Sequence, residues 1–319
     1  MSKVYDVVMI GAGPSALAAA VYTTREDLKT VLIEKGPVGG LAAVTDLVDN
    51  YPGFAKGISG LELAQNFQAH AERFGAQIEY GEVTQIIDGP IKTVKTTEGD
   101  FNAKAVLIAT GSSYKQLGIP GEKEYYGRGV HYCATCDGAF YRDKKLAVVG
   151  GGNSAVQEAL FLLRFATHID LLVRSEVKAS EILKDDLKKA VDAGKITIHT
   201  NTTTNEIIGE DNKVIKVKVT KEGKATDLAV DGVFVFIGLI PNTRFLKNSG
   251  VELDQFGFVV TDKDLQTAVP GIFCSGDVRS GATMQIASAA GEGATAALKM
   301  REHLEMLERK VVTPMSEKV

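Results

Sequence analysis

The stretch YDVVMIGAGPSALAAAVYTTREDLKTVLIE, residues 5–34, decides the fold. A short apolar run from Tyr5 to Ile10 leads into the turn GAGPSA at residues 11–16, and an alanine-rich stretch continues to about Arg25. The pattern predicts a strand over 5–10, a helix to about residue 25 and a second strand over 30–34, which ends at Glu34. Strand, glycine turn, helix, strand and terminal acid are typical of a dinucleotide-binding unit, and we predict one here.

The glycine turn has a chemical reason to be short and free of side chains. Glycines let the backbone approach a pyrophosphate, whose charge then lies against the amide groups and the positive dipole end of the following helix. The carboxylate of Glu34 is placed to accept hydrogen bonds from ribose hydroxyls. Such a turn also occurs in ordinary α/β domains, but with strand, helix and acid all present we favour dinucleotide binding.

The same pattern returns in the middle of the chain. LAVV at residues 146–149 precedes the turn GGGNSA at 150–155, and a strand pattern follows from His168 to Arg174. We therefore predict a second nucleotide-binding unit, with a helix over 156–165. Val173 stands where the first unit has Glu34, and Arg174 follows it. The missing acid and the guanidinium favour a nucleotide with a 2′-phosphate, although Arg174 can also be a solvated charge near Glu176.

Two segments rich in glycine and proline, residues 111–129 and 238–243, are predicted to carry the chain between domains. Residues 115–242 then form an inserted domain, and residues 1–114 and 243–319 pair into the other. The closing segment has a strand pattern at 271–275, then Gly276 and Asp277, and an alanine-rich helix pattern running toward Leu307. We expect an α/β fold with two Rossmann-like domains, the second inserted into the first.

Two of the chain's three cysteines form the motif CATC at residues 133–136. This spacing lets two thiols close a small, reversible disulfide, in which a thiolate is the attacking species. Zinc is the competing interpretation, but a structural zinc site needs about four ligands and the chain offers only Cys274 besides this pair. We predict redox exchange at Cys133 and Cys136, and no metal site.

Other candidate polar groups have more than one interpretation. Asp137 follows the CATC motif and can exchange a proton as thiols change charge, or it can form a turn with Gly138. Asp277 can bond a cofactor hydroxyl or cap the next helix. Cys274 lies in an apolar strand pattern and is predicted to be a buried structural thiol. The five histidines form no HxxxH or HExxH pattern, and none is assigned to catalysis.

Composition narrows the class of protein. The chain has a formal net charge of -4 and 45% hydrophobic residues, and it contains no basic block, so neither nucleic-acid binding nor a polybasic membrane patch is expected. Charged residues or glycine interrupt every apolar run before it could span a bilayer. The beginning of the sequence has no pattern of a secretion signal. We expect a cytoplasmic protein whose partners are small ligands.

Six motifs in order, GAGPSA, CATCDG, GGGNSA, GLIPNT, GIFCSGD and MQIASAAGEG, resemble the low-molecular-weight thioredoxin reductases of bacteria and archaea. The resemblance covers almost the whole chain, and CATCDG between two dinucleotide turns is its most specific part. It implies two three-layer ββα domains, FAD on the discontinuous domain, a nicotinamide nucleotide (NADPH) on the inserted one, a homodimer, and thioredoxin or a similar small dithiol protein as partner. It also implies that Cys136 is the thiol nearest the flavin, that Cys133 attacks the partner's disulfide and that Asp137 is the acid.

The resemblance assigns the cofactor sites residue by residue. For FAD it implies Gly11, Gly13, Pro14, Ser15, Ala16, Glu34, Lys35, Gly39, Gly40, Leu41, Asn50, Ala109, Thr110, Gly111, Gly276, Asp277, Gln285 and Ile286. For the nicotinamide nucleotide it implies Gly150, Gly152, Asn153, Ser154, Ala155 and Arg174. Because nucleotide and disulfide must both reach one flavin, we expect the inserted domain to rotate about residues 111–129 and 238–243.

The sequence departs from the family pattern at the nucleotide end. NADPH-using members read HRRxxxR where this chain has VRSEVKA at residues 173–179, so Arg174 is the one arginine that remains. NADH, reduced ferredoxin or a deazaflavin are alternative donors. Near the flavin, Leu41 replaces the usual glutamine and Met284 the usual arginine. Two rival functions share the fold: a dithiol oxidase that uses oxygen, and a redox-responsive flavin-binding module without catalysis.

Overall fold

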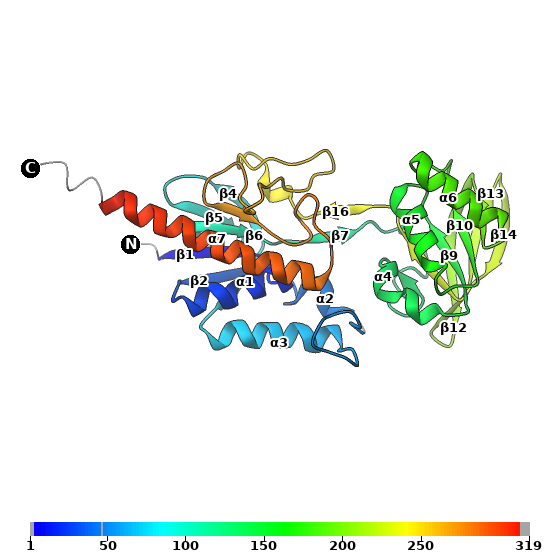
Figure 1. Ribbon diagram of the computed structural model, residues 1–319, viewed down its shortest axis with the longest axis horizontal. Coiled ribbons are helices and arrows are strands. Elements are labelled where there is room, and N and C mark those ends of the chain that lie inside the picture. The colour runs from blue at the N-terminus through cyan, green and yellow to red at the C-terminus, as the bar shows by residue number, and fades with distance from the viewer. Residues whose placement is uncertain (1–2, 46, 313–319) are drawn as a thin grey trace, which may run out of the picture. The chain divides into compact units, whose positions relative to one another are not determined.

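The computed structural model describes residues 3–45 and 47–312, with the backbone alone at 310–312 (Figure 1). The chain divides into two compact units. The first unit contains the described residues up to Ser113 and from Ile240 onward, and the second unit is Tyr114–Leu239. Residues 313–319, which the sequence analysis placed in the discontinuous domain, lie outside the described residues. No helix in the described part of the chain is long and apolar enough to cross a membrane.

The first unit is built on a sheet with the strand order β3-β2-β1-β6-β5-β4, in which β17 also pairs with β6. Strands β1, β2, β3, β6 and β17 are parallel, whereas β4 and β5 form an antiparallel extension. Its strands are β1 (Val4–Ile10), β2 (Thr30–Glu34), β3 (Gln77–Tyr80), β4 (Val83–Ile87), β5 (Lys92–Thr96), β6 (Asp100–Ile108) and β17 (Ile272–Cys274). Its helices are α1 (Pro14–Arg25), α2 (Gly40–Ala43), α3 (Gly60–Arg73), the 3-10 turn η2 (Arg244–Leu246) and α7 (Ile286–Val312).

Successive side chains of the parallel strands point to opposite faces of the sheet and pack into two hydrophobic cores, one on each face. Val7 and Met9 of β1 face a core that includes α1 and α7, two helices from opposite ends of the chain that lie side by side in Figure 1. Val8 and Ile10 face the other core, which the β4–β5 hairpin and the segment around Val259 complete. Helices, parallel sheet and a second β layer therefore make three layers.

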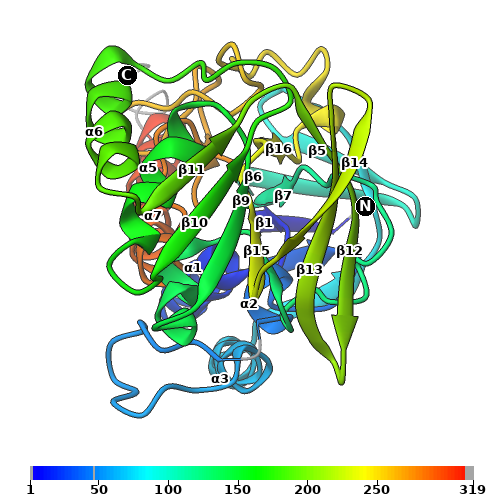
Figure 2. The same cartoon turned by 90° about the vertical axis from the view of Figure 1, so that its right-hand side faces the viewer.

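The second unit repeats this plan. Its parallel sheet has the order β11-β10-β9-β15-β8, and β12, β13 and β14 form a separate antiparallel sheet. In Figure 2, α5 and α6 lie on one side of the parallel sheet and β12–β14 on the other. The strands are β8 (Val130–His131), β9 (Lys145–Val149), β10 (His168–Leu172), β11 (Ile196–His199), β12 (Thr202–Glu210), β13 (Lys213–Lys221), β14 (Lys224–Ala229) and β15 (Gly232–Val235). The helices are α4 (Ala134–Asp137), the 3-10 turn η1 (Gly138–Tyr141), α5 (Asn153–Leu162) and α6 (Glu181–Asp192).

The two chain segments that join the units pair with each other. Strands β7 (Ser112–Tyr114) and β16 (Leu239–Pro241) form a two-stranded sheet. On the side of the first unit, the Asn242 amide donates to the carbonyl of Thr110 at 2.8 Å, and the hydroxyl of Thr110 donates to the carbonyl of Asn242 at 2.8 Å. The glycine-rich segments of the sequence therefore contain an ordered strand pair where the chain passes between units.

The strands and helices predicted from the two glycine turns are present, with different ends. Helix α5 begins at Asn153 and ends at Leu162, instead of spanning 156–165, because the last residues of the turn already form its first helical turn. The final helix extends beyond Leu307, to Val312. The sequence analysis named no strands over 202–229, although Asp211 and Asn212, with φ of 49° and 60°, mark a tight hairpin turn there.

Candidate functional site

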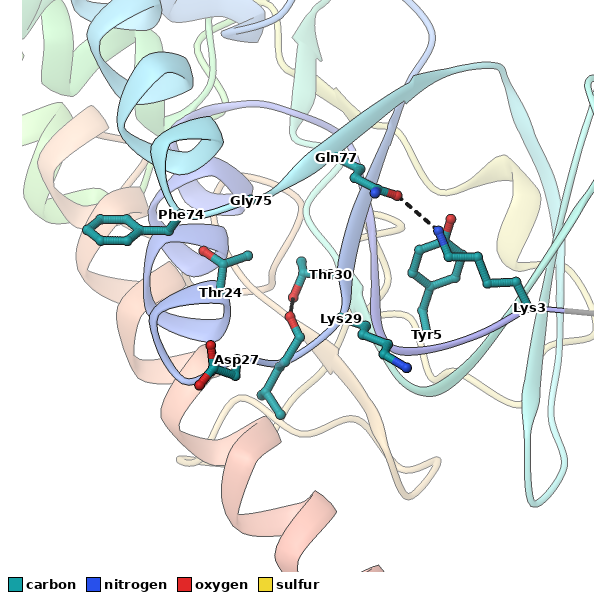
Figure 3. Close-up of a pocket in the computed structure, with 10 residues that line it drawn as sticks. Lys3, Tyr5, Thr24, Asp27, Lys29, Thr30, Phe74, Gly75 and Gln77 are labelled. Atoms are coloured by element: carbon teal, nitrogen blue, oxygen red, sulfur yellow. Dashed lines mark hydrogen bonds between the residues drawn. The ribbon is translucent and has the colours of Figure 1, made fainter.

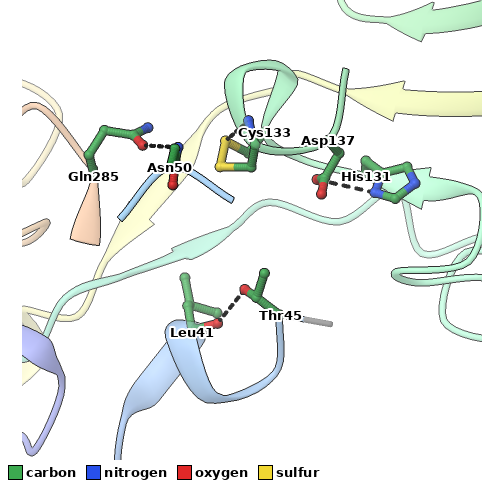
Figure 4. The surroundings of a disulfide bond; sticks show 8 residues. Leu41, Thr45, Asn50, His131, Cys133, Asp137 and Gln285 are labelled. Carbon is green, nitrogen blue, oxygen red and sulfur yellow. Dashed lines mark hydrogen bonds and ion pairs between the residues drawn. A yellow bond between two sulfur atoms is a disulfide. The ribbon is translucent and has the colours of Figure 1, made fainter. Parts of the chain in front are cut away.

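Cys133 and Cys136 are joined by a disulfide in the second unit, with their Cα atoms 5.3 Å apart (Figure 4). Cys133 immediately precedes the short helix α4, and its sulfur accepts a hydrogen bond from the backbone N–H of Cys136 at 3.2 Å. Both residues are half-buried, whereas the intervening Ala134 is packed in the core. The helical turn thus holds the two Cα atoms at a separation that a disulfide can bridge.

A carboxylate and an imidazole lie next to this disulfide. Asp137 ends α4, and its Oδ2 is 3.1 Å from Nδ1 of His131, which belongs to β8 (Figure 4). The other ring nitrogen of His131 is 2.7 Å from the hydroxyl of Tyr141. His131 is buried and its ring stacks on Phe234 at a centroid distance of 5.1 Å. The redox segment therefore contains a continuous line of three polar side chains, Asp137, His131 and Tyr141.

The first glycine turn, in the first unit, follows β1. Gly11 has a φ of 100°, and a Cβ atom there would lie 2.5 Å from the carbonyl oxygen of Ala109, so only glycine fits. Gly13 is the N-cap residue immediately before α1, and a Cβ atom on it would have no described atom within 4 Å. The first turn of α1 carries no acidic side chain. Its free N–H groups and the open face of Gly13 suit an anionic group such as a pyrophosphate.

Glu34 at the end of β2 holds this turn in place. Its carboxylate accepts hydrogen bonds from the backbone N–H of Ala12 at 2.7 Å and of Gly36 at 2.8 Å. Each carboxylate oxygen has a second lone pair, so these two bonds leave acceptors for a ribose hydroxyl. The side chain of its neighbour Lys35 forms an exposed ion pair with Glu82, at 3.4 Å.

The segment that precedes α7 closes against the start of α1. The hydroxyls of Ser15 and Ser275 are 2.6 Å apart and buried, and a Cβ atom on Gly276 would lie 3.0 Å from the Cβ of Ser15. Burial, with a smaller contribution from the negative charge of Glu292, raises the pKa of Asp277 to about 6. A half-buried carboxyl next to the glycine turn can donate or accept a hydrogen bond to a bound polar group.

Other residues predicted for the flavin site lie around the same unit. The amide of Asn50 donates to Oε1 of Gln285 at 3.1 Å, a bond visible in Figure 4. The N–H of Gly39 donates to the carbonyl of Ala12 at 2.8 Å, which ties the GG pair to the first turn. Leu41 is 40% exposed. The remaining positions follow adjoining backbone: Pro14 and Ala16 are in α1, Gly40 starts α2, Ala109, Thr110 and Gly111 follow β6, and Ile286 starts α7.

The second glycine turn, in the second unit, repeats the backbone of the first. Gly150 has a φ of 143°, and its Cβ atom would lie 2.3 Å from the carbonyl oxygen of Phe236. Gly152 precedes α5, again with no described atom within 4 Å of a Cβ position. Ala155 is fully buried, as Ala16 is in the first turn. This turn can receive an anionic group in the same way.

The loop after β10 differs from the segment after β2. Val173 is buried, and a Cβ atom on Gly151 would lie 2.5 Å from its Cγ1. The N–H of Lys178 donates to the carbonyl of Gly151 at 2.6 Å, and the N–H of Ser180 donates to Oδ1 of Asn153 at 2.8 Å. Among the described residues, the exposed side chain of Arg174 has no ion-pair or hydrogen-bond partner. The loop thus folds onto the turn through its backbone and leaves this guanidinium in solvent.

Two other features of the first unit stand apart from the glycine turn. Cys274 is fully buried in the sheet, and burial raises the pKa of its thiol well above the ordinary value, so it stays protonated and inert. A cavity of about 240 Å³ opens where β1, β2 and β3 begin, and Lys3, Tyr5, Lys29, Phe74 and Gln77 are among its lining residues (Figure 3). Parallel strands place the glycine turn at their opposite, carboxyl ends.

Comparisons with known proteins agree with this geometry. The sequence profile of the family described as "Pyridine nucleotide-disulphide oxidoreductase" matches residues 5–293. The thioredoxin reductase of Bacillus subtilis is 42% identical over 315 residues, which cover 98% of this chain and 98% of that protein. This chain belongs to the thioredoxin reductases of that family. The thioredoxin reductase of Treponema pallidum is 40% identical over 97% of this chain and 100% of its own length.

Solved thioredoxin reductases share the fold of this family member. The crystal structure of the Streptococcus pyogenes enzyme has a TM-score of 0.89 and 41% identity, covering 95% of this chain and 99% of that one. The Giardia duodenalis thioredoxin reductase has a TM-score of 0.89 and 32% identity, covering 96% and 100%. The α/β class with two Rossmann-like domains, predicted from the glycine turns, is therefore confirmed.

Membership in the thioredoxin reductases implies a flavin and a nicotinamide dinucleotide, and the residues present fit such groups. Gly13 and Gly152 each leave open space at the start of a helix where a Cβ atom would intrude. Neither helix has an acidic residue in its first turn. Both turns therefore offer an anion-binding helix end and close backbone approach, which are the requirements of a dinucleotide pyrophosphate.

The structure brings together residues that are far apart in this thioredoxin reductase sequence. Within the first unit, the hydroxyls of Ser15 and Ser275 meet, as do the side-chain amides of Asn50 and Gln285. The sequence analysis assigned no role to His131, yet this residue contacts Asp137. Its signal was local: a histidine, the CATCD motif and a tyrosine all occur within residues 131–141. Without the fold, nothing shows that those three side chains converge.

Proposed function

We propose that this chain is an FAD-dependent thioredoxin-disulfide reductase. In this function a reductant, with NADPH as the first choice, supplies two electrons that open the Cys133–Cys136 disulfide, and the resulting dithiol reduces thioredoxin or a similar small protein. The observation that carries the proposal is the half-buried Cys133–Cys136 disulfide beside a carboxylate, in a chain that is 42% identical to a thioredoxin reductase over 98% of its length.

FAD is proposed for the first unit and the nicotinamide dinucleotide for the second. The Gly11 turn, the carboxylate of Glu34 and the polar groups around Asp277 would hold FAD, together with the other first-unit positions assigned to it. The Gly150 turn and the start of α5 would hold the second dinucleotide. When bound, FAD supplies an acceptor for two electrons that it can pass on to a disulfide. The protein's part is binding, orientation and proton management.

The chemistry at the redox pair is thiol–disulfide exchange. The Cys133 thiolate attacks a disulfide of the partner, and the Cys136 sulfur then displaces the partner and restores the Cys133–Cys136 bond. Cys133 and Cys136 are both half-buried, so their separate roles rest on the resemblance to the family. Asp137 is proposed as the group that exchanges protons with the sulfurs, because its carboxylate follows Cys136 directly.

The electron donor that we propose is NADPH, with two alternatives. NADPH is favoured by Arg174, whose exposed guanidinium is available for a 2′-phosphate, and by the absence of an acid at residue 173. NADH or reduced ferredoxin remain alternatives because the other two arginines of the family motif are replaced by Ser175 and Ala179. Ala179 is buried, so this loop cannot place a charged side chain at that position without rearranging.

We also propose a homodimer in the cytoplasm, as the resemblance to the family implies. A rotation of the second unit about the segments 111–129 and 238–243 would let both the dinucleotide and the disulfide serve one flavin. The paired strands β7 and β16 run within these segments and are the natural place for such a motion.

One experiment tests the function and its donor together. The oxidised, FAD-loaded protein is titrated without oxygen with NADPH, NADH and reduced ferredoxin in parallel, while flavin absorbance is followed, and oxidised thioredoxin is then added. We expect NADPH to bleach the flavin and thioredoxin to restore its colour as free thiols form. A Cys136→Ser variant should keep the bleaching and lose the thiols. Oxygen consumption with a small dithiol and no nucleotide, in place of thioredoxin reduction, would instead identify a dithiol oxidase.

A further inference from the structure

His131 lies directly behind the carboxylate that we propose as the proton-exchanging group. Its Nδ1 is 3.1 Å from Oδ2 of Asp137, and its Nε2 is 2.7 Å from the hydroxyl of Tyr141. The side chain of His131 is 6% exposed and that of Asp137 is 18% exposed, so both groups are largely shielded from solvent, the imidazole more than the carboxylate. A buried ring with both nitrogens bonded has a fixed orientation.

The surrounding packing is arranged to keep these three groups in line. The His131 ring stacks on Phe234 of β15, and the Tyr141 ring stands edge-on to both. Tyr141 fits against the start of β15 because residue 232 is glycine: a Cβ atom on Gly232 would lie 2.4 Å from the Tyr141 ring. The line of polar groups is thus supported by α4, η1, β8 and β15 together.

The charges around Tyr141 define which way the hydrogen bonds run. Burial and the negative charges of Asp137 and Asp231 raise the pKa of the Tyr141 phenol, so it stays protonated and donates to Nε2 of His131. Neutral imidazole then carries its proton on Nδ1, which donates to the Asp137 carboxylate. Three titratable groups surround the His131 ring or its Tyr141 partner: Asp137 on α4, Tyr141 itself on η1, and Asp231 just before β15. The Tyr141 phenol, the His131 imidazole and the Asp137 carboxylate are thus joined by hydrogen bonds along which a proton can pass from one group to the next.

We propose that His131 is a positioning residue for Asp137 and that Asp137, His131 and Tyr141 form a proton path that supplies and drains the carboxylate during thiol–disulfide exchange. The proposal rests on the proposed function, because Asp137 exchanges protons with sulfur only in a disulfide reductase. Histidine has the side chain best suited to relay protons near neutral pH.

The proton balance of the exchange shows why such a path is useful. One sulfur–sulfur bond forms between Cys133 and Cys136 while one breaks in the partner, and two electrons move from the enzyme's sulfurs to the partner's. The enzyme's two thiols lose two protons, and the partner's two sulfurs gain two. The carboxylate of Asp137 holds one proton at a time, so it must be emptied or refilled within each exchange. An imidazole bonded to it can do so without admitting water behind the disulfide.

A second histidine–carboxylate pair in the same unit provides a matched control. Nε2 of His199 is 2.8 Å from Oδ1 of Asp170, a buried carboxylate that also pairs with Lys145 at 3.0 Å. This pair bridges β9, β10 and β11, away from the redox segment in sequence. It lies outside the redox segment, so a His199→Asn variant measures what losing a half-buried histidine bonded to a buried carboxylate does by itself.

The main test uses the FAD-loaded protein, reduced without oxygen and mixed with oxidised thioredoxin in a single turnover. His131→Asn keeps an N–H near the Nδ1 position but cannot relay a proton, and Tyr141→Phe removes only the hydroxyl. We expect both variants to slow the exchange, His131→Asn by about tenfold, and added imidazole to restore the His131→Asn rate. His199→Asn should exchange like the unaltered protein. An unchanged His131→Asn rate, or a slow rate that imidazole does not restore, would overturn the proposal.

A second measurement needs no thioredoxin and so separates failure of the proposal from failure of the proposed function. The pH dependence of iodoacetamide alkylation is followed at each cysteine of the dithiothreitol-reduced protein by peptide mass spectrometry. We expect His131→Leu, which removes the Nδ1–H donor, to move the midpoint of at least one cysteine to higher pH, because the negative charge of Asp137 is then no longer offset by that hydrogen bond and disfavours a nearby thiolate. If neither midpoint moves, the path is wrong, whatever the partner. If the unaltered protein reduces no thioredoxin while the midpoint does move, the proposed function fails and the coupling of His131 to the thiols stands.

Discussion

The two glycine turns of this protein have nearly the same backbone but different surroundings. Gly11 and Gly150 both have positive φ and would both clash through a Cβ atom with a carbonyl oxygen, of Ala109 in one case and Phe236 in the other. After the first turn, the Glu34 carboxylate binds backbone N–H groups. After the second, a loop folds onto the turn through backbone bonds at Gly151.

This difference shows that the two parts of a dinucleotide site are under separate constraints. The phosphate-holding part depends on close backbone approach, which leaves no choice but glycine and a small residue. The ribose-reading part depends on one side chain at the end of the second strand, and that side chain can change without altering the fold. The chain thus has the phosphate-holding glycine turn in both units, but it has the ribose-reading acid only after the first turn, at Glu34.

Replacing the first glycine of each turn should have the largest effect. Gly11→Ala puts a Cβ atom 2.5 Å from the Ala109 oxygen at a φ of 100°, and we expect FAD to be lost, with a strain of roughly 1–3 kcal/mol. Gly150→Ala should instead keep FAD and lose the nucleotide. Absorbance gives the flavin content, and calorimetry gives nucleotide binding. Gly13→Ala separates backbone strain from lost ligand space: its Cβ atom meets no described atom within 4 Å, so the turn should stay unstrained while FAD, whose pyrophosphate we assign to that space, binds more weakly. A Gly11→Ala protein with full flavin would contradict the role of this turn.

Glu34→Gln tests the ribose-reading carboxylate, which follows the first glycine turn but not the second. The neutral amide keeps one acceptor oxygen and places an NH2 group against the second N–H, of Ala12 or Gly36. A hydrogen bond from a ribose hydroxyl to a charged carboxylate contributes about 1.5–3 kcal/mol, so losing it should make FAD bind about 10- to 100-fold more weakly. The dissociation constant of FAD, measured by reconstituting the flavin-free protein, checks this. Unchanged affinity would mean that the carboxylate supports the turn without contributing to the cofactor site.

Arg174→Gln tests the corresponding place beside the second turn. The side chain has no partner among the described residues, so the substitution should leave stability unchanged while raising the KM for NADPH by about tenfold. The KM for NADH should not change. Ser175→Arg should act in the opposite direction, since residue 175 is exposed. Lys178→Gln is the matched control, because it removes one exposed positive charge from the same loop. Equal effects on NADPH and NADH would show that this loop does not read the 2′-phosphate.

Sequence reasoning succeeded where the determinants are local. The GAGPSA and GGGNSA turns require glycine for steric reasons that a motif records, and the strands and helices around them follow from the same short stretches. It could not anticipate that Ala179 is buried, because that depends on how the loop after β10 packs on the core. The contact of His131 with Asp137 was hidden for a similar reason. A strand, a helix and a 3-10 turn must fold before these side chains meet.

A pH-dependent stability effect, the smallest we expect, concerns Asp277 in the first site. Burial and the charge of Glu292 raise the pKa of Asp277 from 3.8 to about 6. Between these values the folded, flavin-free protein holds a proton that the unfolded chain has released, so its stability falls as pH rises through that window. Allowing for partial solvent access, the loss should be about 1 kcal/mol. Urea unfolding across this range, compared with Asp277→Asn, measures it. Because asparagine does not titrate, the difference between the two proteins should change with pH, and a constant difference would show that Asp277 titrates normally.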